Sequence, residues 1–323
     1  MRSGIVQRLA PVLDPLFAPL VWLAAQQLKL VRRMTPGRSR YCMAVLDSVG
    51  VYPLIDHYYD PLINLRNLRK PLSDIRNIAG IEFRTAEYLA FCETLTEMPE
   101  MLDTPDSIGA GENRYHFSAT TFGPLDATIF YGIIRRYRPR RIVEVGCGMS
   151  TLVALDATRR NAREDRSYSC EHVCIEPYEQ PWLETLPVSL SRNKLEEVDP
   201  SLAEGLEAGD ILFIDSSHII RPQGDVLTAV FEWVGRVKPG VLIHVHDILS
   251  PRDYPEEWLF SCRFMWNEQY LLEAFLAFNE SFRILLPLNH LFVEQTKTML
   301  QCCPAQAKPG RTIPTSFWFI RVK

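Results

Sequence analysis

Residues Arg141–Val153 read RIVEVGCGMSTLV, and this stretch decides the fold. Its first half is a short β-branched run that carries one acid, Glu144, and it predicts a buried strand. Gly146 and Gly148 then permit a sharp turn and a close approach of the backbone to a ligand. Two hydroxyl residues, beginning at Ser150, precede an apolar run, as a capped helix would start. The stretch therefore predicts the first strand, turn and helix of a nucleotide-type sheet, where ligands bind at the carboxyl ends of the strands.

The spacing of the glycines separates two kinds of cofactor. A dinucleotide fingerprint has glycine at its first, third and sixth positions, whereas the sixth position here is Thr151. The form acid-x-Gly-x-Gly-x-Ser/Thr resembles motif I of the class I S-adenosylmethionine (SAM) methyltransferases. That resemblance implies that Glu144, Gly146, Gly148 and Ser150 bind the cofactor, with the turn under its methionine and ribose part and Glu144 near its amino group. An NAD-dependent oxidoreductase stays open as another enzyme class.

Strands and helices alternate through the second half of the chain, which predicts right-handed parallel crossovers. Helices are expected over residues 124–137 and 224–237, a helical region over 256–278, and strands over 141–145, 172–176, 188–190, 210–215, 241–247, 282–286 and 317–322. Residues 124–323 resemble the class I methyltransferases throughout, in particular the branch of small-molecule O-methyltransferases. The resemblance implies an α/β fold with a Rossmann-like, doubly wound, seven-stranded sheet, mostly parallel with an antiparallel last strand.

The second predicted strand ends in an acid, Glu176. In nucleotide-type sheets an acid at this place accepts hydrogen bonds from ribose hydroxyls. Glu176 follows Gly148 by 28 residues, against about 20 in the usual spacing, and a charged insertion between them accounts for the excess. Tyr178 comes next and is a candidate cover for the adenine.

Ionisable side chains follow the fourth and fifth predicted strands, at Asp215, His218, His246 and Asp247. Because the carboxyl ends of parallel strands meet at one edge of a sheet, we expect these residues beside the glycine turn. His218 is the preferred base for removing a proton from an acceptor hydroxyl, since an imidazole titrates near neutral pH. Asp215 or Asp247 is expected to orient it, Asp215 is also expected to border the cofactor, and His246 is the second choice. His244, two residues back on its strand, is expected to be a buried structural residue.

A metal-assisted version of this site is the alternative. Some relatives in the family hold a divalent ion with acids at the ends of the fourth and fifth strands, and Asp215 and Asp247 match those positions. The neighbouring residue is His246 rather than another acid, which argues against magnesium and leaves a softer ion open. The metal-free interpretation is preferred.

Net charge and cysteine spacing bear on nucleic-acid binding, cellular compartment and metal binding. The net charge of −4 does not suggest a nucleic-acid-binding protein. The eight cysteines form no CxxC pair, which indicates free thiols in a reducing compartment and predicts a cytoplasmic protein. Cys170, His172 and Cys174 alternate along a strand and share one face, but without a fourth ligand they are interpreted as structural.

Residues 1–40 combine a short apolar segment, Leu16–Ala25, with seven basic residues and one acid. The segment is shorter than the roughly 20 apolar residues of a spanning helix. Its Trp22 and basic flanks fit a helix lying at the inner face of a membrane. A helix packed on the protein's own core or on a partner in a homo-oligomer is an equal alternative. Residues 41–123 are expected to form a cap over the substrate end of the sheet.

Three functions follow in order of preference. The first is a SAM-dependent methyltransferase that methylates a hydroxyl of a small-molecule acceptor, a sugar or a secondary metabolite. The second is the NAD-dependent oxidoreductase. The third is a non-catalytic protein that keeps the SAM-binding fold and docks at a membrane.

Overall fold

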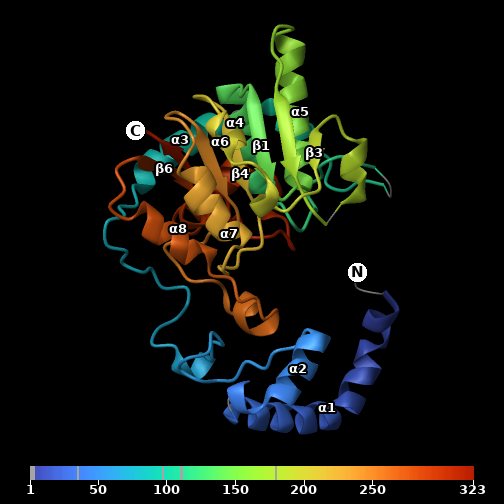
Figure 1. Ribbon diagram of the computed structural model, residues 1–323. Helices are drawn as coiled ribbons and strands as arrows, with labels where there is room; N and C mark the ends of the chain where they lie inside the picture. Colours follow the sequence, from blue (N-terminus) through green and yellow to red (C-terminus); the bar gives the residue numbers. More distant parts are fainter. Residues whose placement is uncertain (1–3, 35, 97, 110–111, 179) are drawn as a thin grey trace. The chain divides into compact units, whose positions relative to one another are not determined.

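The structure is a computed structural model, and it describes residues 4–34, 36–96, 98–109, 112–178 and 180–323 (Figure 1). The chain divides into two compact units, Met1–Arg69 and Lys70–Lys323. The division falls inside the segment 41–123, so that residues 70–123 belong to the larger unit.

The smaller unit is helical. Its helices are α1 (Gly4–Arg33) and α2 (Arg40–Val49), with 3₁₀ turns at Pro36–Arg38 and Leu65–Asn67. The long helix α1 bends along its course (Figure 1), because three internal prolines each remove a backbone donor. The helix is longer than the apolar segment predicted from sequence, and over Arg8–Arg33 it is long and apolar enough to cross a membrane by length and composition. The flanking Leu, Gln, Lys and Arg residues, which are good helix formers, account for the extension.

The larger unit is built on a seven-stranded sheet with the order β3-β2-β1-β4-β5-β7-β6. The strands are β1 (Arg141–Val145), β2 (Glu171–Ile175), β3 (Ser189–Ser191), β4 (Ile211–Ile214), β5 (Leu242–Val245), β6 (Phe282–Pro287) and β7 (Phe317–Arg321). The first five strands run parallel, and β7 is antiparallel to both of its neighbours. This architecture confirms the predicted fold, including the antiparallel last strand.

Helices cover both faces of the sheet (Figure 1). One hydrophobic core holds side chains from α3 (Thr85–Thr96), α4 (Pro124–Tyr137), α5 (Met149–Glu164), α9 (Leu288–Glu294) and α10 (Thr296–Cys302). The other holds side chains from α6 (Ser201–Glu204), the π-helix Thr228–Val234 that continues α7 (Asp225–Leu227), and α8 (Glu268–Leu276). Alternate residues of β1 enter opposite cores, Ile142 the first and Val143 the second. Short 3₁₀ helices lie at Pro99–Asp103, Pro181–Thr185, Leu195–Glu197 and Pro304–Ala307.

Two helix predictions are wrong in detail. The helix expected over 224–237 is one α turn followed by a π-helix. The helical region expected over 256–278 is a π-helix at Glu257–Ser261 and the separate helix α8. Between them Arg263 has a left-handed φ of 59°, which ends the first helix. The rings of Phe264 and Trp266 then stack with their centroids 4.5 Å apart, a contact that the periodicity of the sequence does not reveal.

Candidate active site

The glycine turn after β1 is locked to the end of β4. Gly146 has a φ of 76°, which L side chains rarely adopt, and a Cβ added to it would overlap the carbonyl oxygen of Asp215. The Gly146 N–H donates to the Ile175 carbonyl at 2.9 Å, and the Asp215 N–H donates to the Val145 carbonyl at 2.8 Å. The ends of three neighbouring strands therefore form one rigid edge.

A cavity of about 230 Å³ opens on this edge. Four of the residues that the sequence analysis assigned to the cofactor line it together, namely Gly146, Glu176, Tyr178 and Asp215. The Glu176 carboxylate accepts hydrogen bonds from the backbone N–H groups of Cys147 at 3.2 Å and Tyr178 at 2.9 Å. These bonds fix the carboxylate at the mouth of the turn. The Tyr178 side chain is exposed.

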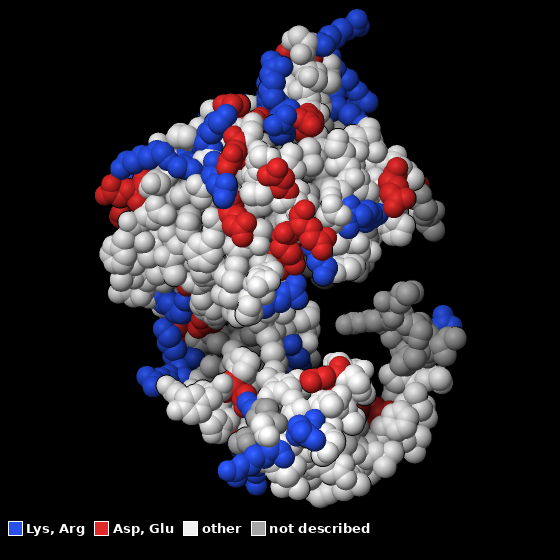
Figure 2. Space-filling model, in the orientation of Figure 1, with Lys and Arg blue, Asp and Glu red and all other residues white. Residues whose placement is uncertain are grey.

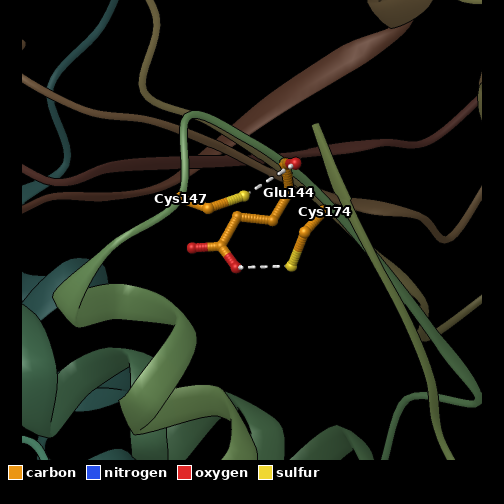
Figure 3. Close-up of side chains that lie close together, drawn as sticks. All are labelled: Glu144, Cys147 and Cys174. Carbon is orange, nitrogen blue, oxygen red and sulfur yellow. Dashed lines mark hydrogen bonds between the residues drawn. The ribbon is translucent and has the colours of Figure 1, made fainter. Parts of the chain in front are cut away.

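Glu144 lies beneath the turn rather than in this cavity. It is fully buried, and its carboxylate accepts hydrogen bonds from the Ser150 hydroxyl at 2.6 Å and from His172 Nε2 at 2.7 Å. The thiols of Cys147 and Cys174 lie beside it (Figure 3). The described residues that line the cavity include neither Glu144, Ser150 nor Gly148, so Glu144 and Ser150 act on the turn from behind.

His172 completes this buried group, a role that sequence reasoning missed. Burial works against its charged form, but Cys174 and Glu144 beside it raise the pKa of His172 to about 10. An imidazolium therefore neutralises the buried carboxylate. The register of β1 against β2 places Glu144 opposite Cys174, and the alternation along both strands puts His172 on the same face. That alternation was the one available indication in the sequence.

Helix α5 begins before Ser150, the first of the hydroxyl residues that were expected to cap it. Its N-cap is Gly148, whose N–H donates to the Thr151 hydroxyl at 3.1 Å. The Ser150 hydroxyl is used for Glu144 instead of capping the helix.

A second group converges at the ends of β4 and β5. His218 Nε2 lies 3.3 Å from the Asp215 carboxylate and 3.5 Å from that of Asp247, and its Nδ1 lies 2.9 Å from Glu268. His218 and Asp247 both have left-handed φ angles, 60° and 55°. Such backbone strain persists only where the surroundings hold it, and it gathers at functional sites.

This arrangement sets the charge of His218. Burial opposes protonation, but carboxylates face both ring nitrogens and hold the pKa of His218 well above its usual range. Burial likewise opposes ionisation of Asp215, yet His246 and His218 lower the pKa of its carboxyl. Without any other cation, His218 is an imidazolium held among acids at neutral pH.

His246 occupies a different position in the same network. Its Nε2 lies 3.2 Å from the Thr315 hydroxyl oxygen, and that hydroxyl lies 2.9 Å from Asp247 Oδ1. The single hydroxyl hydrogen of Thr315 is used in the hydrogen bond to the Asp247 carboxylate. The Thr315 oxygen therefore accepts a hydrogen bond from the N–H at His246 Nε2. Burial works against the charged form of His246, but Asp215, Asp247 and Asp126 raise its pKa above the usual value. When the ring is neutral, its lone pair lies on Nδ1, a buried atom with no hydrogen-bond partner among the described residues.

A cavity of about 740 Å³ adjoins this network. Asp215, His246 and Asp247 line it together with an aromatic wall and a second loop, Trp258, Phe264, Trp266, Arg311 and Thr312 among them. Asp215 lines both cavities. The two spaces therefore meet at the end of β4.

Comparison with known proteins now identifies the domain. Residues 143–248, which run from β1 past the end of β5, match the model of a methyltransferase domain. The chain contains a methyltransferase domain. Together with the strand order, this match agrees with the class I SAM-dependent methyltransferase fold that the sequence predicted, and it implies SAM as the cofactor.

Two further similarities were found for this methyltransferase. An uncharacterized protein of Archaeoglobus fulgidus is 28% identical over 163 residues, which cover 47% of this chain and 72% of the relative. Among solved structures, the MycE methyltransferase from the mycinamycin biosynthetic pathway, in complex with Mg, SAH and mycinamycin VI, matches with a TM-score of 0.34 and 14% identity. That match covers 71% of this chain, and it spans about half of the MycE chain, 55%.

His244 lies in the core of the methyltransferase domain. Its ring stacks on Phe213 at 3.9 Å between centroids and contacts Trp318 at 4.8 Å. Burial, together with His246 nearby, lowers the pKa of His244 well below its usual range, so the ring is neutral. Its position agrees with the structural role expected from sequence.

Glu268 was not predicted from sequence. It is buried in the first turn of α8, 50 residues beyond His218. An acid in a first helical turn is explained equally well by the helix dipole. Its pairing with His218 is visible only once α8 is placed against the loop after β4.

Proposed function

We propose that the protein is a SAM-dependent O-methyltransferase that acts on a small-molecule acceptor, a sugar or a secondary metabolite. The observation that carries the proposal is the position of Asp215, which borders both the cavity at the glycine turn and the larger cavity beside it. A methyl donor in the first space and an acceptor in the second would meet at this residue.

In this proposal the smaller cavity binds SAM. Gly146 lets the backbone pass close to the ligand, Glu176 accepts hydrogen bonds from the ribose hydroxyls, and Tyr178 covers the adenine. Glu144 and Ser150 hold the turn from below, with Gly148 at the start of α5. The cofactor supplies a methyl group already activated on a sulfonium, so that the protein needs to align the acceptor and remove its proton.

The acceptor fits the larger cavity by chemistry. Its aromatic wall, Trp258, Phe264 and Trp266, offers a flat apolar surface, and Asp247 and Arg311 offer polar groups on the other sides. Apolar walls with a few convergent polar groups are the usual form of small-molecule sites.

His246 is the base in this proposal, and His218 positions the acids. A base needs a free lone pair, and both nitrogens of His218 already face carboxylates. His246 lines the acceptor cavity, and its buried Nδ1 has no hydrogen-bond partner among the described residues. Asp215 and Asp247, held by His218, favour the imidazolium that His246 becomes after it takes the acceptor's proton.

The same residues support a second interpretation, in which they bind a divalent cation. The donor atoms of Asp215, His218 and Asp247 all lie within 4.8 Å of one another. Two carboxylates and one imidazole suit a transition metal. Metal-binding histidines usually hydrogen-bond a carboxylate through the ring nitrogen that does not bind the ion, as His218 Nδ1 does with Glu268. These three residues would hold the ion, which would lower the pKa of a bound acceptor hydroxyl.

Calorimetric titration of the purified chain with SAM, and separately with NADH, tests the proposal. Binding of SAM without binding of NADH supports it. Binding of NADH alone would overturn it in favour of an oxidoreductase. Transfer of a labelled methyl group to a panel of sugars and polyketides, with and without a chelator, then tests the acceptor class and the metal reading. SAM binding without transfer to any acceptor would favour a non-catalytic role.

A further inference from the structure

The N-terminal helix α1 carries an apolar face along most of its length, which Gln27 interrupts. At 3.6 residues per turn, the large apolar side chains fall on roughly one half of the helix. They are Leu9, Val12, Leu13, Leu16, Phe17, Leu20, Val21, Leu23, Leu28, Leu30 and Val31. Most of them are exposed, for example Leu16 at 65% and Leu20 at 63%.

The opposite half of α1 carries the charges. Arg8, Asp14, Lys29, Arg32 and Arg33 all lie there, as do Gln26 and the three prolines, with Trp22 among them. The prolines lie on this side and so do not interrupt the apolar face. A helix with one wide apolar face and one basic face is the pattern of a helix lying in a membrane interface.

Helix α2 extends the same kind of surface within the smaller unit. Tyr41, Val45 and Val49 are exposed, and α2 buries none of its residues. Figure 2 shows a broad uncharged surface over this unit, with a few basic and a few acidic side chains beside it. Contiguous exposed apolar surface of this kind marks sites of interaction with membranes or with other proteins.

We propose that the smaller unit docks on an anionic membrane surface, with α1 lying in the plane of the interface. Residues 1–40 have a net charge of +6, which complements anionic lipid head groups. The apolar half of α1 enters the acyl boundary, and its basic half stays at the head groups. The protein would then act on acceptors at the inner face of the membrane.

The distribution of charge favours this arrangement over a spanning helix. The uncharged stretch between Asp14 and Lys29 is 14 residues, or about 21 Å of helix, against roughly 30 Å of hydrocarbon. A span would place Asp14 or Lys29 in the hydrocarbon, which is costly. The length and composition of Arg8–Arg33 alone would permit a span, but its polar half would then face lipid.

Co-sedimentation of the full chain with vesicles tests the proposal. We expect binding to phosphatidylcholine vesicles that contain phosphatidylglycerol, weaker binding without it, and a decrease in binding as salt increases. Absence of binding to the anionic vesicles would overturn the proposal. Extraction of the full chain from cell membranes is a second test. If detergent releases it and alkaline carbonate does not, the helix spans the membrane and the proposal is overturned.

Two matched variants locate the contact on one face. Leu20→Glu adds a negative charge to the apolar face and should weaken vesicle binding about tenfold or more. Gln26→Glu adds the same charge to the polar face and should weaken it at most about fivefold, the effect of one charge at the surface. Equal effects of the two would overturn the proposed orientation. A dimer in solution that Leu20→Glu dissociates would instead assign the face to a second copy of the chain.

Both substitutions lie outside the larger unit. SAM binding should therefore be unchanged in both variants, which shows that the chain is folded. Loss of vesicle binding with normal SAM binding separates this proposal from the proposed catalytic function.

Discussion

Gly146 is the residue on which the geometry of the turn depends most directly. Gly146→Ala should reduce SAM affinity by about tenfold or more, because the added methyl meets the Asp215 carbonyl at a φ of 76°. Gly148→Ala is the matched control, since a Cβ there meets nothing within 4 Å and the backbone φ of −177° is extended. Titration calorimetry with SAM compares the two. Equal affinities in the two variants would contradict the proposed cofactor site.

The two imidazoles can be separated by their effect on the reaction. His246→Asn should slow methyl transfer by about 10²-fold or more with SAM affinity unchanged, as expected for loss of a base. His218→Asn should alter the pH profile and acceptor KM, because Asp215 loses a cation that lowers the pKa of its carboxyl and Asp247 loses an ion-pair partner. Single-turnover rates across pH distinguish the variants. A normal rate in His246→Asn, with a large loss in His218→Asn, would return the role of base to His218.

The pair of His172 and Glu144 makes stability depend on pH. The pKa of His172 is raised to about 10 in the folded chain, against about 6.5 in the unfolded chain. The stabilisation from its protonated ring is therefore complete below about pH 6.5 and is lost as the pH rises through about 10. The free energy of unfolding should therefore fall between pH 7 and pH 10. Denaturant titrations at several pH values measure this slope. The slope should be shallower in His172→Gln, and an unchanged slope would contradict the ion pair.

At the scale of elements, helix α4 shows how closely the layers approach. Gly132 lies where a Cβ would overlap the carbonyl oxygen of Leu95 in α3. Gly132→Ala should therefore destabilise the chain by about 1–3 kcal/mol. Gly235→Ala, whose new methyl would meet nothing closer than 3.3 Å, is the control. Denaturant midpoints compare the two, and equal midpoints would show that α3 can move aside.

The elements also show what the sequence could predict. Strands and the turn were readable because they are short, strongly apolar and ended by glycine or acid, as in residues 141–146 and 210–215. The cluster at the ends of β4 and β5 was predictable because parallel strands share one edge. Glu268 and Thr315 were not, since long-range packing brings them to His218 and Asp247. The π-helices escaped prediction because their apolar spacing resembles that of an α-helix.

At the scale of the whole molecule, the two units should separate cleanly. Residues Lys70–Lys323 hold both cavities and the whole sheet. A chain that begins at Lys70 should fold, unfold cooperatively and bind SAM with the affinity of the full chain. Calorimetry and thermal unfolding measure both properties. Failure of this shorter chain to bind SAM would show that the first 69 residues contribute to the cofactor site.

Asp215 is the one described residue common to the linings of the two cavities, and this separation has a consequence for evolvability. The loops at 255–266 and 311–313 can change in sequence without altering the lining of the cofactor cavity. Libraries that randomise these loops should therefore yield variants with new acceptor ranges at an unchanged Kd for SAM. Natural lineages of this fold could diversify along the same route, keeping one donor while they exchange acceptors.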